Sequence, residues 1–173
     1  MTDRKKYVRF GLMILTSTVL MYGLMYLNTY AWSHLFFSET RLYMAFLMGA
    51  VMAIVMLGFM LSMYKNRQLN LSIFGGSLML FVLCLWLVRS QTTVADRSYM
   101  KAMIPHHSIA IMTSERAKIE DARVRKLADE IIEAQRREIK EMEWLIEDIR
   151  KHGAATTEAE AQARAVPDFQ GTK

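Results

Sequence analysis

The first half of the chain consists of three long apolar runs separated by short polar segments. The runs cover residues about 10–27, 42–64 and 71–88, and none of them contains a charged side chain. Because an α-helix rises about 1.5 Å per residue, each run is long enough to cross a hydrocarbon core of about 30 Å. The pattern therefore predicts three transmembrane helices in a membrane domain of residues 1–89.

Basic residues flank these runs unevenly and predict their orientation. Four basic residues precede the first run, and Lys65 and Arg67 lie between the second and the third, whereas the segment between the first two runs carries only Glu39 and Arg41. The positive-inside rule places the N-terminus and the second connection in the cytoplasm. We expect a protein of the bacterial cytoplasmic (inner) membrane whose C-terminal domain is periplasmic or extracellular and whose first partner is the lipid bilayer.

Residues 90–152 have a different pattern, with apolar positions recurring every three or four residues, as on one face of a helix. Asp121 is a plausible N-cap of a second outer helix and Gly153 a plausible stop signal. Pro105 either kinks one long helix or starts a new one. No turn residue separates Val88 from Thr93, which allows the third span to run directly into the outer helix. The fold class is all-α, with an antiparallel helical hairpin that turns near residue 120.

Two helices bury too little surface for independent stability, so we expect the hairpin to complete a four-helix bundle by dimerisation. A homo-oligomer, with a dimer favoured, is the predicted assembly. Residues 153–173 are rich in Ala, Thr and Glu and have little periodicity, which predicts a flexible tail.

Charge and cysteine content exclude several functions. The net charge is +5, but residues 1–88 hold seven Lys/Arg against two Asp/Glu, while the remainder holds fifteen of each. The excess belongs to the apolar half, so we expect no nucleic-acid partner. One cysteine excludes an intramolecular disulfide and a four-cysteine metal site. Phosphate-binding loops, zinc-protease motifs and Glu-x-x-His pairs are absent from the sequence, and we expect no enzymatic activity.

Folding the hairpin near residue 120 brings one set of side chains together between the two helices: Met100, Met103, His107, Gln135, Glu138 and Met142. Soft thioethers select Cu(I), and imidazole accepts Cu(I) or Cu(II), so this set predicts a copper site. The alternatives are that the methionines are core packing and that His107 is a buried histidine satisfied by a hydrogen bond. His34 lies in the loop between the first two spans, where it either supplements a site near the membrane or is solvated, and we expect it to be solvated.

Two segments carry a resemblance to a known family: Met103-Ile104-Pro105-His106-His107 and Gln135-x-x-Glu138-Ile139-x-x-Met142-x-x-Leu145. In this order they resemble the domain-of-unknown-function family 305, over roughly residues 94–150. The resemblance implies a ferritin-like fold, secretion or membrane anchoring in bacteria, and an association with copper binding and tolerance. It points to Met103, His106, His107 and Met142 as ligand candidates, and to Glu138 and Gln135 as ligands or their hydrogen-bond partners.

This chain departs from the family pattern at one position. The family usually has a methionine where Thr113 stands, and Met112 lies one position earlier, which turns the thioether by about 100° around the helix. Together these features predict a membrane-anchored extracytoplasmic metal-binding protein, with copper as the ion, for tolerance, buffering or delivery. The alternative is a non-metal structural or assembly subunit of a membrane complex that uses the hairpin for oligomerisation.

Overall fold

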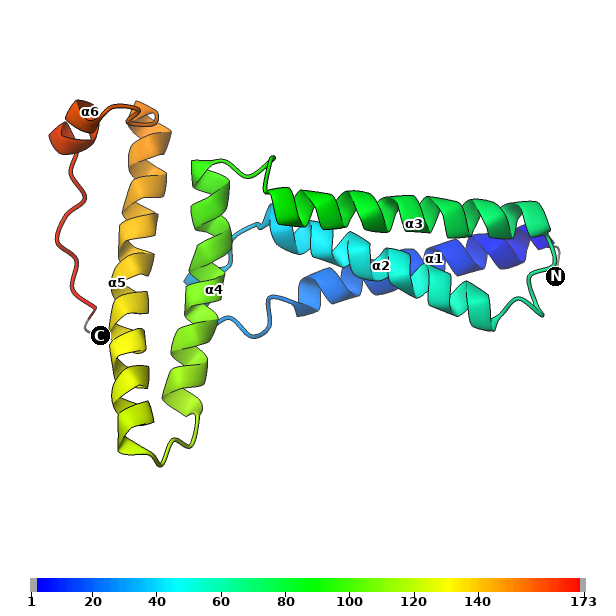
Figure 1. Ribbon diagram of the computed structural model, residues 1–173, viewed down its shortest axis with the longest axis horizontal. Coiled ribbons are helices and arrows are strands. Elements are labelled where there is room, and N and C mark those ends of the chain that lie inside the picture. The colour runs from blue at the N-terminus through cyan, green and yellow to red at the C-terminus, as the bar shows by residue number, and fades with distance from the viewer. Residues whose placement is uncertain (1–2, 172–173) are drawn as a thin grey trace. The chain divides into compact units, whose positions relative to one another are not determined.

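The computed structural model describes residues 3–171, and over this range the fold is all-helical, as the sequence pattern predicts (Figure 1). The first two residues of the predicted membrane domain and the last two of the predicted tail lie outside the described residues. The elements are α1 (Asp3–Leu24), the 3₁₀-helix η1 (Trp32–His34), α2 (Glu39–Phe59), α3 (Arg67–Ser90), α4 (Asp96–Arg116), α5 (Ala122–His152) and α6 (Glu158–Ala163).

The described chain forms two compact units. The chain up to Leu27 and residues Glu39–Thr93 form the first, which we call the span unit. Residues Asn28–Ser38 and the chain from Val94 onward form the second, the hairpin unit. The loop between α1 and α2 therefore belongs to the same unit as the C-terminal helices.

The helices of the span unit, α1, α2 and α3, are each long and apolar enough to cross a membrane. In the most apolar stretch of α3 only 6% of the residues are buried. Because so much apolar side-chain surface would be costly in water, the three helices are compatible with membrane anchoring. Among the described residues, α1 includes the basic segment before the apolar run, because Lys and Arg have a good helix propensity.

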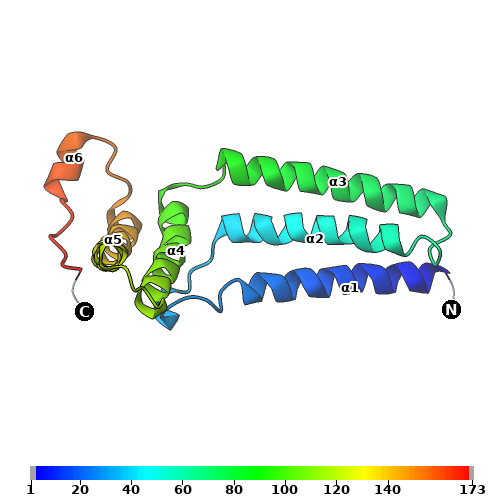
Figure 2. The same ribbon diagram turned by 60° about the horizontal axis from the view of Figure 1, so that its bottom comes forward.

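Helix α2 packs against both α1 and α3, and lies between them in Figure 2. Small buried residues line α2, namely Ala45, Gly49, Ala50 and Ala53. At Gly49 a Cβ atom would collide with the hydroxyl of Thr18 on α1. The absence of a side chain at Gly49 therefore sets how closely these two helices approach.

A hydrogen-bonded cluster joins the start of α1 to the connection between α2 and α3. The hydroxyl of Tyr7 donates to Oδ1 of Asn70 at 2.7 Å, and the amide of Asn66 donates to the Tyr7 hydroxyl at 3.2 Å. The buried Asn70 in turn donates to the carbonyl of Tyr64 at 2.8 Å. These bonds supply partners for the side chain of the buried Asn70.

The third span does not run on into the outer helix, contrary to the continuation that the sequence allows. Helix α3 ends at Ser90 because Gln91 adopts a left-handed backbone conformation with φ 53°. The Gln91 amide donates to the carbonyl of Leu87, and its side-chain amide donates to the carbonyl of Val88 at 2.7 Å. These bonds satisfy carbonyls at the helix end that have no intrahelical partner.

In the hairpin unit α4 and α5 run antiparallel, side by side, over a core of Ile104, Ile111 and Ile139 (Figure 1). Pro105 lies buried within α4, so a single helix passes through it and no new helix starts there. The predicted caps are confirmed. The carboxylate of Asp121 accepts from the amide of Arg123, and Gly153 follows the last residue of α5 with φ 79°.

The segment after α5 contains α6 and turns back along α5. Arg164 donates to the carboxylate of Asp148 at 2.7 Å, and Lys140 donates to the carbonyl of Gln170 at 2.7 Å. Gly171 lies so close to the backbone of Glu133 that a Cβ atom would not fit. The flexibility expected of this tail stays a prediction.

The close approach at Gly49 can be tested by adding one methyl group. We expect Gly49→Ala to lower the melting temperature of the detergent-purified chain, because the new Cβ overlaps the Thr18 hydroxyl. Gly58→Ala is the matched control on the same helix, since a Cβ there meets nothing within 4 Å. Adding Thr18→Ala to Gly49→Ala should restore stability. Equal melting temperatures for the two single variants would contradict the packing described above.

Candidate metal centre

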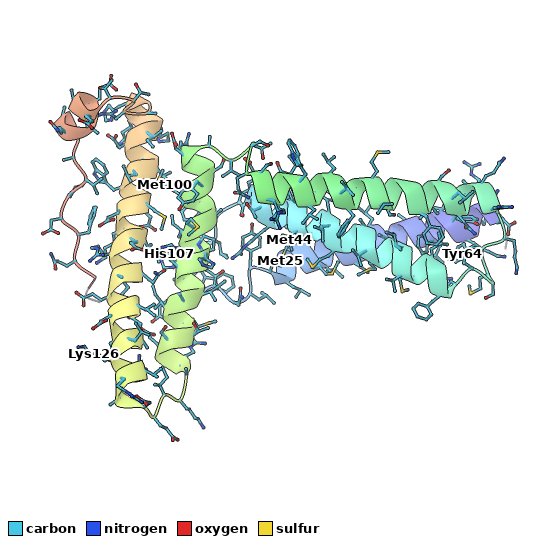
Figure 3. All side chains as sticks on the ribbon, in the orientation of Figure 1. Met25, Met44, Tyr64, Met100, His107 and Lys126 are labelled. Atoms are coloured by element: carbon cyan, nitrogen blue, oxygen red, sulfur yellow. The ribbon has the colours of Figure 1, made fainter. Side chains whose placement is uncertain are left out.

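The face of α4 that packs on α5 carries His107. Met100, Ile104, His107 and Ile111 are spaced by three or four residues and are all buried. Figure 3 shows Met100 and His107 on α4 at the side facing α5. The helical period that buries the isoleucines therefore also buries an imidazole and a thioether.

Both ring nitrogens of His107 have partners. Nδ1 lies 2.9 Å from the carbonyl oxygen of Met103, one turn earlier in α4. Nε2 lies 2.7 Å from Oε2 of Glu138 on α5. This is the contact across the hairpin that joins the two sequence motifs.

These partners determine which atoms can carry a proton. A carbonyl oxygen only accepts, so Nδ1 of His107 must be the donor in its bond to Met103. In a neutral ring, Nε2 then presents a lone pair to a carboxylate oxygen of Glu138. The 2.7 Å separation of Nε2 and Oε2 is a direct hydrogen bond, so one proton lies between them and is carried by the ring or by the carboxyl group. A bound metal ion would replace that proton and take the two atoms as ligands.

The other predicted ligands surround this pair to different degrees. Met142 packs against the isoleucine core, Met100 is buried, and Met103 and Met112 are half-buried. His106 is exposed, and its ring centroid lies 6.1 Å from that of His107. Adjacent residues on a helix point about 100° apart, so the two rings do not share one face. Gln135, on the same helix as Glu138, is half-buried.

Few side chains with nitrogen or oxygen donors surround His107 and Glu138. Within residues 3–171 no three His, Cys, Asp or Glu side chains lie close enough together to hold a metal ion. A metal at His107 and Glu138 would therefore draw its remaining ligands from methionine thioethers, from water or from a second copy of the chain. Thioethers favour a soft ion such as Cu(I).

The turn of α4 that carries His107 is also held from the side of the α1–α2 loop. Ser108 is fully buried, and its hydroxyl accepts from the backbone amide of Tyr30 at 2.8 Å. The same hydroxyl lies 2.9 Å from Nδ1 of His34. Because Ser108 uses one lone pair for Tyr30, its own hydrogen is free to be donated to His34.

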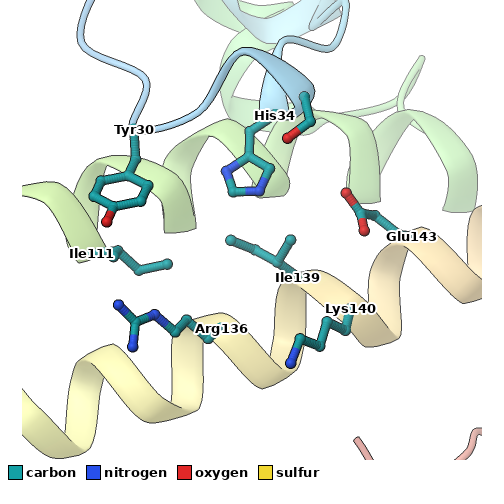
Figure 4. A pocket seen from close by; sticks show the side chains of 8 residues that line it. Tyr30, His34, Ile111, Arg136, Ile139, Lys140 and Glu143 are labelled. Carbon is teal, nitrogen blue, oxygen red and sulfur yellow. The ribbon is translucent and has the colours of Figure 1, made fainter. Parts of the chain in front are cut away.

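A cavity of about 370 Å³ lies between this loop and the two helices (Figure 4). Tyr30 and His34 face Ile111 and Ile139 across it, while Arg136 and Lys140 reach in from α5, and Glu143 lies at the other side of His34. The expectation that His34 is solvated is wrong, since its ring is half-buried and hydrogen-bonded. No pattern near His34 in the sequence indicates this contact, because its partner Ser108 is 74 residues away.

We expect the docking of the α1–α2 loop on α4 to depend on pH. Burial lowers the pKa of His34 below its ordinary 6.5, and the nearby carboxylate of Glu143 opposes this only partly. The released loop binds a proton more readily than the docked loop, so docking is strongest above pH 6.5 and weakens as the pH falls below it. NMR titration should give His34 a pKa under 6.5, with protection of the Tyr30 amide decreasing in the same range.

His34→Asn is the matched control for this effect, because an amide can replace the hydrogen bond to Ser108 but does not titrate. In that variant protection of the Tyr30 amide should not change between pH 7 and pH 5. A His34 pKa at or above 6.5 in the native chain would contradict the prediction.

Comparison with known proteins places the hairpin unit in a family. Residues 87–170 match the family model described as Domain of unknown function (DUF305). The chain is also 31% identical over 104 residues to "Uncharacterized protein L153" of Acanthamoeba polyphaga mimivirus, a match that covers 56% of this chain and 68% of that protein. No solved structure matches the chain. The region of the family match begins at the end of α3 and includes both motifs of the candidate site, and the chain belongs to the DUF305 family.

Proposed function

We propose that this chain is a membrane-anchored metal-binding protein whose hairpin unit binds copper outside the cytoplasm, for tolerance, buffering or delivery. One observation carries the proposal. The ring of His107 is oriented by the Met103 carbonyl so that Nε2, the nitrogen available to a metal ion, lies 2.7 Å from Oε2 of Glu138. A backbone carbonyl that fixes the tautomer of a histidine in this way is common at metal sites.

The surrounding thioethers support copper as the ion. Met100, Met103 and Met142 lie on the same helix pair, and Cu(I) accepts thioether and imidazole together. His106 and Met112 remain candidates for a ligand shell that a second copy of the chain or a rearranged side chain completes. No catalytic role is assigned to any of these residues.

The span unit supports the membrane part of the proposal. Four basic residues at the start of α1 and the basic residues of the α2–α3 connection support a cytoplasmic location for those ends in a bacterium, and with it a hairpin unit on the outer side of the membrane. Exposed Val124 and Leu127, one turn apart at the start of α5, support the dimer. Burying them against a second hairpin would complete a four-helix bundle.

The first test measures Cu(I) affinity of the full chain in detergent, in competition with a chromophoric chelator. We expect His107→Ala to weaken binding by roughly tenfold or more, because it removes the oriented nitrogen ligand. His152→Ala is the matched control, since that exposed histidine bonds only to Asp148 at the far end of α5. His106→Ala should weaken binding less than His107→Ala does.

Glu138→Gln separates metal binding from a purely structural pair. A glutamine amide can donate to Nε2 of His107, so the fold should survive, but a neutral amide is a poor replacement for a carboxylate ligand. Lost metal affinity with an unchanged melting temperature is the expected result. If the native chain binds no Cu(I) and the variant only melts earlier, the pair is structural, and the hairpin serves oligomerisation in a membrane complex.

The choice of ion is tested with the methionines. We expect Met103→Leu and Met142→Leu to weaken Cu(I) binding while leaving any Zn²⁺ binding unchanged, because Zn²⁺ prefers nitrogen, oxygen and thiolate ligands. Met79→Leu, an exposed methionine of α3, is the control. Tighter binding of Zn²⁺ than of Cu(I) by the native chain would exclude a thioether-based copper site.

A further inference from the structure

The loop between α1 and α2 has an unusual composition for a connection at a protein surface. Residues Asn28–Ser38 contain no Asp, Glu, Lys, Arg, Gly or Pro, and five of the eleven are large apolar or aromatic residues (Tyr30, Trp32, Leu35, Phe36 and Phe37). Connections in water are usually rich in turn residues and charge. The α4–α5 connection of this chain fits that rule, since it includes Lys118, Glu120 and Asp121.

The loop presents two different faces. On one, Phe36 packs against the core of Ile104, Ile111 and Ile139, while the Tyr30 amide and His34 bond to Ser108. These contacts hold the loop on the hairpin unit.

The other face is apolar and uncovered. The exposed fraction is 84% for Trp32, 58% for Phe37 and 38% for Leu35. Three large apolar residues exposed within six positions, on a segment already fixed by hydrogen bonds, make a surface that favours an apolar partner.

Connectivity identifies that partner. The loop follows α1 and precedes α2, both of membrane length, so Trp32 is eight residues from the last residue of α1 and seven from the first of α2. A segment tethered this closely at both ends stays near the surface of the bilayer. Tryptophan prefers the interface between headgroups and acyl chains, and an uncharged loop carries little desolvation cost on entering it.

We propose that the face formed by Trp32, Leu35 and Phe37 inserts into the outer interface of the lipid bilayer, while the opposite face of the loop holds α4 at Ser108. The inference rests on the membrane location proposed above. The loop then acts as a lipid-embedded support for the turn of α4 that carries His107. Its partner is the lipid interface, and neither water nor a second copy of the chain covers it.

The chain's three tryptophans provide the test, because one lies in each region concerned. Trp32 is in the loop, Trp86 in α3 and Trp144 in α5. Full-length variants that keep a single tryptophan, with Phe at the other two positions, are reconstituted into phosphatidylcholine vesicles. Lipids brominated at defined acyl positions then quench the fluorescence from within the bilayer, and acrylamide quenches it from the water.

We expect shallow bromines to remove about half of the Trp32 emission and deep bromines to remove less, as for a residue at the interface. Trp86 should also be quenched by brominated lipid, and Trp144 only by acrylamide. In the chain that keeps Trp32 alone, Phe37→Ser should reduce the quenching by bromine, whereas Ser33→Ala, next to Trp32, should not.

The two proposals fail in different ways. If Trp86 is quenched by brominated lipid but Trp32 is quenched only by acrylamide, the loop lies in water and the inference is overturned. If Trp32 is protected from both quenchers, a protein surface covers it, which also overturns the inference. If Trp86 itself escapes the brominated lipid, the membrane location is wrong, and the inference fails together with it.

Discussion

The hairpin unit depends on how it accommodates the imidazole of His107 between two helices. Burying a polar ring costs free energy unless its nitrogens are hydrogen-bonded. In His107 one nitrogen is bonded to the Met103 carbonyl and the other to the Glu138 carboxylate. The second bond crosses from α4 to α5, so it fixes the register of the two helices as well as the direction of Nε2. Stability of the hairpin and the proposed chemistry therefore use the same atoms.

The unit that contains this pair is not contiguous in sequence. Ser108, directly after His107, is held by Tyr30 and His34 from a loop that lies outside the region of the family match. Two helices alone leave one face of their core open, and Phe36 of the loop covers part of it. A connection between two apolar spans thus supplies the third layer of a small helical unit.

Much of this architecture could be predicted, because it follows from period and length. Three apolar runs, the Asp121 cap and the Gly153 stop all have direct sequence signals. The choice of Glu138 within the predicted set has no such signal, since equal distances from a turn near residue 120 pair His107 with Gln135 or Glu133, about one turn before Glu138. Side chains on a helix lean toward its N-terminus. His107 therefore leans away from the turn and Glu138 leans toward it, which moves their meeting point along α5.

The end of α3 and the docking of His34 could not be predicted from the sequence. Gln91 has no intrinsic preference for a left-handed conformation, and it takes one because its amide and side chain close the helix. His34 is held by a serine 74 residues away, which no local pattern records. The end of α3 depends on backbone groups left unpaired at a helix end, and the docking of His34 depends on a tertiary hydrogen bond. Such contacts produce no periodic pattern in the sequence. The burial of His107 does produce one, because the imidazole lies on the same face of the helix as the isoleucines around it.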